Sequence, residues 1–235
     1  MSEKICSAVI VAAGKGKRMK SSVDKQFIRL GGKTILERTV EKFEKSAVIK
    51  EVVIVTGSEH IAELEEIRTR CRWKKVSKIV CGGKERQNSV YNGICALSEN
   101  TDIVLIHDGV RPFVTEEEIE KMAEEADKKG ACVLAARVKD TIKVCSVDGK
   151  VLSTPERSSL WAMQTPQAFR YGLIKNAYEA LDESAAVTDD ASVAERAGYD
   201  VYIVEGGYDN IKITTPEDLY IAEAILKKDD KNENC

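Results

Sequence analysis

A run of small and basic residues, from Ala12 to Met19, has the composition of a loop that holds phosphate groups. It reads Ala-Ala-Gly-Lys-Gly-Lys-Arg-Met and directly follows an apolar stretch. Small residues let backbone N–H groups close around phosphate oxygens, and lysine and arginine add positive charge. A Walker loop needs Gly-Lys-Ser/Thr and a dinucleotide fingerprint needs a third glycine, and this run has neither. Taken alone, the Gly-x-Gly pattern is also compatible with a tight turn after a strand.

Two basic side chains in and after this run can act on one phosphate group. Arg18 lies in the run itself, and Lys25 follows in the polar sequence Asp24-Lys25-Gln26-Phe27. If both point at a triphosphate, they stabilise the charge that develops at the α-phosphorus during transfer. A solvated surface position is the ordinary alternative for either residue taken singly.

An aspartate stands at the end of another apolar run. Asp108 follows Ile103–Ile106 closely, so we expect it at the carboxyl end of a strand, the edge where α/β sheets bind ligands. Capping a turn or helix is the common structural role of aspartate. For Mg²⁺ a lone aspartate suffices, because this ion usually keeps waters and binds through one or two carboxylates plus substrate phosphates.

Strand-like and helical patterns alternate along most of the chain. Apolar runs typical of buried strands are Ile5–Val11, Val52–Thr56, Val76–Val80, Ile103–Ile106, Cys132–Ala136 and Val201–Val204. Thr34 with Glu37 and Thr115 with Glu118 form capping boxes that predict helix starts. Thr215-Pro216 opens a further helix with proline at its favoured first position. The alternation indicates one α/β domain over residues 1–226, with a mostly parallel sheet covered by helices on both faces.

One segment interrupts this alternation. Thr141–Ser146 and Lys150–Thr154 are strand-like and flank Val147-Asp148-Gly149, and an Asp-Gly between two such runs is a strong hairpin signal. A hairpin inserted at about 139–160 has no partner in the parallel sheet, so we expect a protruding arm. A lone hairpin is only marginally stable, which favours a homodimer that covers it. The polar tail over 227–235 is predicted to be disordered.

Composition and charge exclude several classes of protein. The chain has 235 residues and a net charge of −3, which argues against a nucleic-acid binder. Its seven cysteines lack Cys-x-x-Cys spacing and indicate reduced, mostly buried thiols, and two histidines exclude a His-rich metal site. No apolar stretch approaches the roughly 20 residues of a membrane span, and the N-terminal stretch is too short for a signal peptide. We therefore expect a cytoplasmic protein without membrane contact.

The motifs together resemble one enzyme family. AAGKGKRM and DKQF are followed in order by GGKERQNSV, HDGVRPF, VKDTIK, ERSSLWAMQTPQAF, VTDDAS and DNIKITTPEDL, over roughly residues 5 to 225. This series resembles the cytidylyltransferases that act on 2-C-methyl-D-erythritol 4-phosphate in the non-mevalonate route to isoprenoids. The resemblance implies a Rossmann-like nucleotidyltransferase fold, a dimer that exchanges β-hairpin arms, and transfer of a cytidylyl group from CTP with release of pyrophosphate.

The resemblance also implies which residues bind CTP. The phosphates would contact the first loop, and Arg18 and Lys25 would stabilise the pentacoordinate transition state. Gly82, Gly83 and Ser89 would lie near the cytosine. Asp108 would contact the ribose, the acceptor or hydrated Mg²⁺, an ion held mainly through the CTP phosphates. The implied CTP set is Ala12, Ala13, Gly14, Gly16, Arg18, Lys25, Gly83, Ser89 and Asp108.

A second set is implied for the phosphorylated polyol. Arginine forks suit its phosphate and threonines suit its hydroxyls. The acceptor phosphate is the nucleophile and is already ionised, so no general base is needed, and Arg157 and Lys212 would aim it. The implied acceptor set is Asp108, Arg111, Thr141, Arg157, Thr165, Thr188 and Lys212.

Other functions remain open from the sequence. A ribitol 5-phosphate cytidylyltransferase shares the first loop, the His-Asp strand end and the Thr-Pro-Gln stretch. Lys143 and Leu160–Met163 favour the erythritol type instead. A dinucleotide-dependent oxidoreductase is disfavoured by Met19 in place of a glycine. A non-catalytic nucleotide-binding module is disfavoured because every charged residue of the site is present. Gly109-Val110 stands where many family members have two alanines, a mild change in packing.

Overall fold

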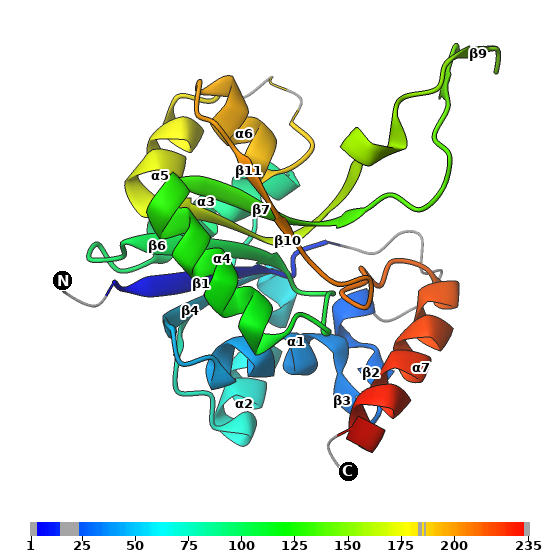
Figure 1. Cartoon of the computed structure of the whole chain (residues 1–235). Helices are drawn as coiled ribbons and strands as arrows, with labels where there is room; N and C mark the ends of the chain where they lie inside the picture. The colour runs from blue at the N-terminus through cyan, green and yellow to red at the C-terminus, as the bar shows by residue number, and fades with distance from the viewer. Residues whose placement is uncertain (1–3, 15–23, 183–184, 186, 233–235) are drawn as a thin grey trace.

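The described part of the chain folds around one central sheet of seven strands, and β1, β4, β6 and β7 are buried over most of their length (Figure 1). The computed structural model describes residues 4–14, 24–182, 185 and 187–232. The strands lie in the order β11-β7-β10-β6-β1-β4-β5. Their bounds are β1 Cys6–Val11, β4 Ile49–Thr56, β5 Val76–Cys81, β6 Ile103–Asp108, β7 Ala131–Arg137, β10 Trp161–Arg170 and β11 Tyr202–Glu205. Six of these strands are the predicted ones, and the pairings β1–β4, β1–β6, β4–β5 and β7–β11 are parallel as expected.

Strand β10 was not predicted. It runs antiparallel between β6 and β7 and is buried from Gln164 to Phe169. Its sequence hides it, because Gln164, Thr165, Pro166 and Gln167 interrupt the apolar pattern. Proline cannot donate to a ladder, and the register with β7 shifts between Met163 and Gln167, around that proline. The sheet is therefore mostly, but not wholly, parallel.

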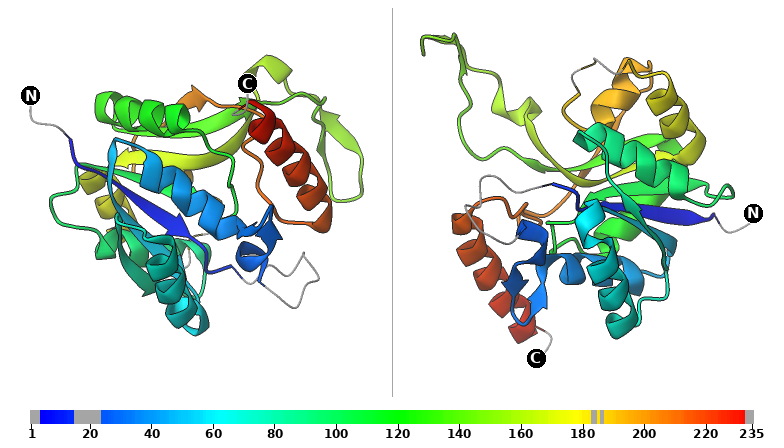
Figure 2. Two further views of the ribbon diagram at one scale, coloured as in Figure 1. Left: turned by 90° about the horizontal axis from the view of Figure 1, so that it is seen from below. Right: turned by 180° about the vertical axis from the view of Figure 1, so that it is seen from behind.

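Helices cover both faces of the sheet, as predicted. Helices α1 (Ile35–Lys45), α2 (Ile61–Cys71) and α4 (Glu116–Lys129) lie on one face. Helices α3 (Arg86–Ala96), α5 (Tyr171–Glu179) and α6 (Asp190–Arg196) lie on the other. Figure 2 shows the two layers from below and from behind. The other elements of the described residues are the 3-10 turns η2 Lys25–Phe27, η3 Ser58–His60 and η4 Arg157–Ser159, the short strands β2 Arg29–Leu30, β3 Lys33–Thr34, β8 Val144–Cys145 and β9 Val151–Ser153, and helix α7 Pro216–Asn232.

Local signals set the helix ends. Thr34 with Glu37 and Thr115 with Glu118 form complete capping boxes, and Gly130 ends α4 at φ 94°. Pro216 begins α7, as predicted. This helix continues to Asn232, however, so the prediction of a disordered tail from residue 227 is wrong for residues 227–232. Residues 233–235 lie outside the described part of the chain.

Alternation along the central strands builds two cores. On β1, Ala8 and Ile10 join the cluster under α1, α2 and α4, while Val9 joins the cluster under α3, α5 and α6. A third cluster joins α7 to β2 through Leu30, Ile213 and neighbouring apolar residues. Among the described residues, no helix is long and apolar enough to cross a membrane. The six described cysteines form no disulfide and only Cys6 and Cys132 are buried, so the expectation of mostly buried thiols is wrong.

The predicted hairpin is present and projects away from the sheet (Figures 1 and 2). Strands β8 and β9 pair antiparallel with each other, and Gly149 adopts φ 87° in the turn between them. This conformation is accessible to glycine at no steric cost. The strands are shorter than expected, and the exposed apolar side chains of the hairpin are Ile142, Val144, Val147, Val151 and Leu152. In the described chain, this two-stranded sheet is separate from the central one.

Helix α3 packs on the sheet without room for a side chain at Gly93. A Cβ atom there would lie 2.4 Å from Cγ1 of Val9 and 2.8 Å from Cγ2 of Val55. Alanine is about 1 kcal/mol better than glycine inside a helix, but overpacking typically costs about 1–3 kcal/mol. We expect Gly93→Ala to lower the free energy of unfolding, measured in urea. Gly172 of α5 has no atom within 4 Å of a built Cβ, so Gly172→Ala should raise it. Equal responses at the two positions would contradict the tight packing.

Candidate active site

A cavity of about 440 Å³ opens at the carboxyl edge of the sheet. Strand β1 is flanked by β4 on one side and by β6 on the other, so the chain leaves this point in opposite directions. Such a switch point leaves a crevice between neighbouring loops, where open α/β sheets bind ligands. The loops after β1, β5 and β6 supply most of the wall. The lining residues are Val11, Ala12, Ala13, Gly14, Lys25, Gln26, Gly83, Lys84, Glu85, Arg86, Ser89, Asp108, Val110 and Lys212.

A second cavity of about 290 Å³ adjoins the first. It is lined by Arg86, Asp108, Arg111, Met163, Gln164, Thr165, Gln167, Thr188, Asp189 and Lys212. Three residues, Arg86, Asp108 and Lys212, line both cavities. These three side chains therefore stand where two ligands in the two cavities would meet.

Asp108 is the anion at this junction. Nζ of Lys212 lies 2.8 Å from its Oδ2, Nε of Arg111 lies 3.6 Å from Oδ2, and Nε of Arg86 lies 3.6 Å from Oδ1. Burial on its own raises the pKa of the Asp108 carboxyl, but the charges of Arg86, Lys212 and Arg111 outweigh it. The pKa of Asp108 is therefore held far below its ordinary value. The carboxylate is ionised at any pH at which the protein works.

A buried hydrogen-bond chain fixes the backbone beside Asp108. The N–H of Asp108 donates to Oγ1 of Thr165 at 3.0 Å, and Oγ1 lies 3.1 Å from Nδ1 of His107. Nε2 of His107 lies 3.1 Å from the carbonyl oxygen of Arg111, which can only accept. Nε2 is therefore the protonated nitrogen, and Nδ1 accepts from the threonine hydroxyl. Burial lowers the pKa of His107 to about 4, so the ring is neutral. The Thr165 hydroxyl therefore makes hydrogen bonds within the protein, to the Asp108 N–H and to His107.

Arg86 is a site residue that sequence reasoning missed. Its Nη1 and Nη2 donate to Oδ1 and Oδ2 of Asp190 at 2.9 and 2.8 Å, a bidentate pair. Asp190 is fully buried and also accepts from the hydroxyl of Tyr178 at 2.7 Å. A signal was available, because Arg86 is the first residue of α3, where the helix dipole disfavours a cation. An arginine at that position needs a carboxylate partner, although the sequence does not say which one.

The turn after β5 brings its backbone close to the first loop. A Cβ atom at Gly82 would lie 2.6 Å from Cβ of Ala13, and one at Gly83 would lie 2.3 Å from Cβ of Asn88. The N–H of Gly83 donates to Oγ of Ser89 at 3.0 Å, and that hydroxyl donates to the carbonyl of Glu85 at 3.1 Å. Gly82, Gly83 and the hydrogen bonds of Ser89 therefore form a closely packed side of the cavity made of small residues and backbone groups.

Most residues of the predicted CTP set line the first cavity, and most residues of the predicted acceptor set line the second. Of the predicted CTP set, the residues around the first cavity are Ala12, Ala13, Gly14, Lys25, Gly83, Ser89 and Asp108. Of the predicted acceptor set, those around the second cavity are Asp108, Arg111, Thr165, Thr188 and Lys212. Gly16 and Arg18 lie outside the described residues. Buried Arg111 is fixed by donating from Nη1 to the carbonyl of Asn210 at 2.7 Å.

Two predicted acceptor residues line neither cavity of this chain. Thr141 and Arg157 belong to the arm and are exposed. Nη1 of Arg157 donates to the carbonyl of Lys139 at 3.0 Å, at the base of the arm. The described chain therefore does not bring them to Asp108.

A family model described as 2-C-methyl-D-erythritol 4-phosphate cytidylyltransferase (IspD) matches residues 6–228. The chain belongs to this family. Enzymes of this name from Alkaliphilus metalliredigens and Halalkalibacterium halodurans are 49% and 52% identical to it. The alignments cover 97% and 96% of this chain, and 96% and 98% of those enzymes.

A solved structure extends the comparison to the fold. The 4-diphosphocytidyl-2C-methyl-D-erythritol synthase of Anaerococcus prevotii superposes with a TM-score of 0.85 at 36% identity, covering 96% of this chain and 97% of that one. Gly109, at the departure from the usual family sequence, leaves little room. A Cβ there would lie 3.1 Å from both Cβ of Ala12 and Cδ1 of Leu36, so an alanine requires small shifts.

The neutral His107 of this cytidylyltransferase makes its stability depend on pH. Its folded pKa of about 4 lies below the unfolded value of about 6.5. As pH falls, the unfolded state therefore binds a proton at His107 before the folded state does. The contribution of the neutral ring to the free energy of unfolding is complete above pH ~6.5 and decreases as pH falls to ~4. The slope is at most about 1.4 kcal/mol per pH unit. The free energy of unfolding, measured in urea, should be compared between the wild type and His107→Gln at each pH. The difference between the two should show this slope. Identical pH profiles for the two proteins would contradict a buried neutral ring.

Proposed function

We propose that this chain transfers the cytidylyl group of CTP to 2-C-methyl-D-erythritol 4-phosphate, giving 4-diphosphocytidyl-2-C-methyl-D-erythritol and pyrophosphate. The observation that carries the proposal is the pair of cavities that meet at Arg86, Asp108 and Lys212. The first has the small loop residues and the basic Lys25 that suit a nucleoside triphosphate. The second has Arg111 and Thr188, which suit the phosphate and the hydroxyls of a phosphorylated polyol. The reacting phosphorus belongs at the junction.

The reaction is an in-line displacement at the α-phosphorus. An oxygen of the acceptor phosphate forms the new P–O bond, and the bond from the α-phosphorus to the bridging oxygen of the β-phosphate breaks. The electron pair leaves with pyrophosphate. The nucleophile is already ionised, and His107 is buried with both ring nitrogens hydrogen-bonded, so no base is assigned. Arg18, Lys25, Arg157 and Lys212 supply positioning and positive charge, which is the main source of catalysis in such transfers.

The site suits Mg²⁺ bound mainly through the CTP phosphates. Asp108 is a single ionised carboxylate at the junction, matching an ion that takes one or two carboxylates and completes its shell with water and phosphate. Mg²⁺ neutralises part of the triphosphate charge when bound. Asp108 and the phosphates would hold it, and excess EDTA should abolish turnover.

We also propose a homodimer built through the arm. The exposed apolar side chains on the hairpin need a cover, and Arg157 and Thr141 line neither cavity of their own chain. An arm that reaches the partner's second cavity would meet both needs. We further propose a single domain that includes residues 1–226 and continues through helix α7 to Asn232 and, because the described cysteines form no disulfide, a cytoplasmic location.

The acceptor is tested by pyrophosphate release from CTP in the presence of Mg²⁺. We expect 2-C-methyl-D-erythritol 4-phosphate to give the highest kcat/KM, with ribitol 5-phosphate, the second candidate acceptor, far lower. Faster turnover of ribitol 5-phosphate would overturn the proposed acceptor.

Lys25→Ala should lower kcat by on the order of 10²-fold with little change in CTP affinity, because its charge acts in the transition state. A Lys25→Ala variant with normal kcat would remove Lys25 from the catalytic role.

The shared site is tested with mixed dimers of Lys25→Ala and Arg157→Ala chains. If the arm crosses to the partner, one site of the mixed dimer collects both substitutions and the other has neither. The mixed dimer should then recover up to about half of wild-type activity, since a two-fold dimer has equivalent sites. If each arm serves its own chain, every site carries one substitution. A mixed dimer no more active than the two mutant homodimers would exclude the crossed arm.

A further inference from the structure

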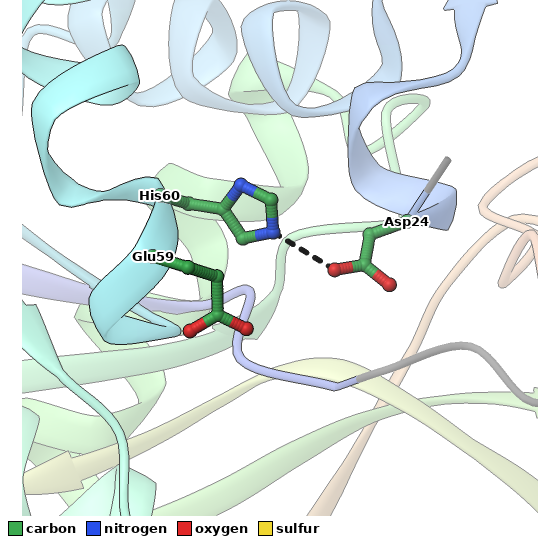
Figure 3. A group of neighbouring side chains, drawn as sticks. All are labelled: Asp24, Glu59 and His60. Atoms are coloured by element: carbon green, nitrogen blue, oxygen red, sulfur yellow. Dashed lines mark hydrogen bonds and ion pairs between the residues drawn. The ribbon is translucent and has the colours of Figure 1, made fainter. Parts of the chain in front are cut away.

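His60 joins two elements that are distant in the sequence. It ends the turn η3 and stands at the N-cap position of α2, and its Nε2 lies 2.9 Å from Oδ2 of Asp24, the residue that precedes η2. Its Nδ1 lies 3.4 Å from Oε2 of Glu63, one turn into α2. The ring also packs on Phe27, with the ring centroids 4.5 Å apart. Figure 3 shows the imidazole directed at Asp24, with Glu59 beside it.

Among the described residues, the two partners of His60 on the segment of η2, Asp24 and Phe27, lie on either side of Lys25. Asp24 precedes Lys25 directly, and Phe27 ends the same turn, which is closed by the Phe27 N–H donating to the carbonyl of Asp24 at 2.9 Å. The Asp24 side chain caps no helix N–H and is instead used by His60. Phe27 is buried in the main core, and Lys25 lines the first cavity. One imidazole thus holds the turn at both ends.

We propose that His60 is a positioning residue for Lys25: by bonding Asp24 and packing on Phe27, it holds the turn Lys25–Phe27 so that Lys25 stays at the nucleotide cavity. This inference rests on the proposed catalytic role of Lys25. Misplacing a group by about 1 Å can cost on the order of 10²-fold in rate, so a support outside the cavity can control turnover.

The charges around His60 favour its protonated form. Asp24 faces it from the segment before η2, and Glu59 and Glu63 face it from its own side. Burial on its own lowers the pKa of His60, and the hydrogen bonds with Asp24 and Glu63 outweigh it, so the pKa is raised. The N-terminus of α2 opposes a cation, but three carboxylates exceed this effect. Candidate ligand atoms of Asp24, Glu59 and His60 lie within 4.8 Å of one another, yet a ring with both nitrogens bonded to carboxylates holds a proton there, not a metal ion.

This proton gives the contact a direction with pH. A raised folded pKa means that the contact is complete below the unfolded value of about 6.5 and weakens as pH rises through the folded pKa. The neutral ring keeps at most one N–H donor, so it cannot bond both Asp24 and Glu63. The support for Lys25 should therefore loosen on the alkaline side.

The first test needs no turnover. The chain has two histidines, so NMR can follow each ring separately. We expect His60 to titrate above pH ~6.5 and Asp24→Asn to lower its midpoint. Amide exchange at Phe27 should quicken in His60→Gln, because the turn is no longer held. A midpoint that Asp24→Asn does not move, or unchanged exchange at Phe27, would overturn the proposal whether or not the chain turns over CTP.

The second test links the contact to the reaction. We expect His60→Gln to lower kcat about tenfold while KM for CTP changes little, because Lys25 acts in the transition state. The ratio of wild-type to variant kcat should fall as pH rises through the measured midpoint of His60, and taking this ratio cancels the titration of the substrates. The double variant His60→Gln/Asp24→Asn should have a kcat no lower than that of the slower single variant, because both substitutions remove the same contact.

The control is Glu66→Gln, which removes an exposed carboxylate from the same helix α2 and should leave kcat unchanged. A wild-type to His60→Gln ratio that is near one, or constant across pH, would overturn the inference. Additive losses in the double variant would also overturn it. Lys25→Ala serves as the reference, and if it too had normal kcat, the proposed role of Lys25 would fail first while the NMR result on the turn still stood.

Discussion

The carboxylate of Asp108 organises the site. A buried anion costs several kcal/mol to remove from water, and that cost is offset only where cations and hydrogen bonds surround it. Asp108 gathers Arg86 from α3, Arg111 from the loop after β6 and Lys212 from the segment before α7. These elements are far apart in the chain, so one charge draws three parts of the fold to a single point. The cations of this cluster outnumber Asp108 and its neighbour Asp190 by one, which leaves the junction suited to phosphate.

Residues outside the ion-pair cluster hold Asp108 and its partners in place. Asp190 fixes the Arg86 fork and is itself bonded by Tyr178, so α5 and α6 help to hold the residue that faces Asp108. On the other side, Thr165 of β10 and His107 of β6 fix the Asp108 backbone through buried hydrogen bonds. Groups held in place before the ligand arrives need little reorganisation during the reaction, which is the electrostatic advantage of an enzyme over water. The antiparallel β10 is thus part of the site as well as of the sheet.

The charged residues that we propose to act in the reaction differ in how the fold holds them. Arg111 and Asp108 are buried in the sheet edge. Lys25 lies on a three-residue turn whose Phe27 packs against His60, and Arg157 lies on the exposed arm. The central cluster is held by its own ion pairs, whereas under our proposals Lys25 relies on a neighbouring element and Arg157 on a partner chain. This division fits a transfer in which binding positions the nucleophile late.

The sequence by itself determined the features whose signals are local. Apolar runs marked six strands, Thr34 with Glu37 marked a helix start, and Asp148-Gly149 marked the hairpin, because each signal lies within a few residues. It also placed Ala12–Gly14 and Asp108 at one edge, since parallel strands share their carboxyl ends. Only the tertiary structure decided which distant side chains meet. Arg86 and Asp190 are 104 residues apart and His60 and Asp24 are 36 apart, and neither pair leaves a periodic trace. Such pairs arise from how crossovers stack helices on the sheet, and that order is set by packing of the whole chain and not by any one segment.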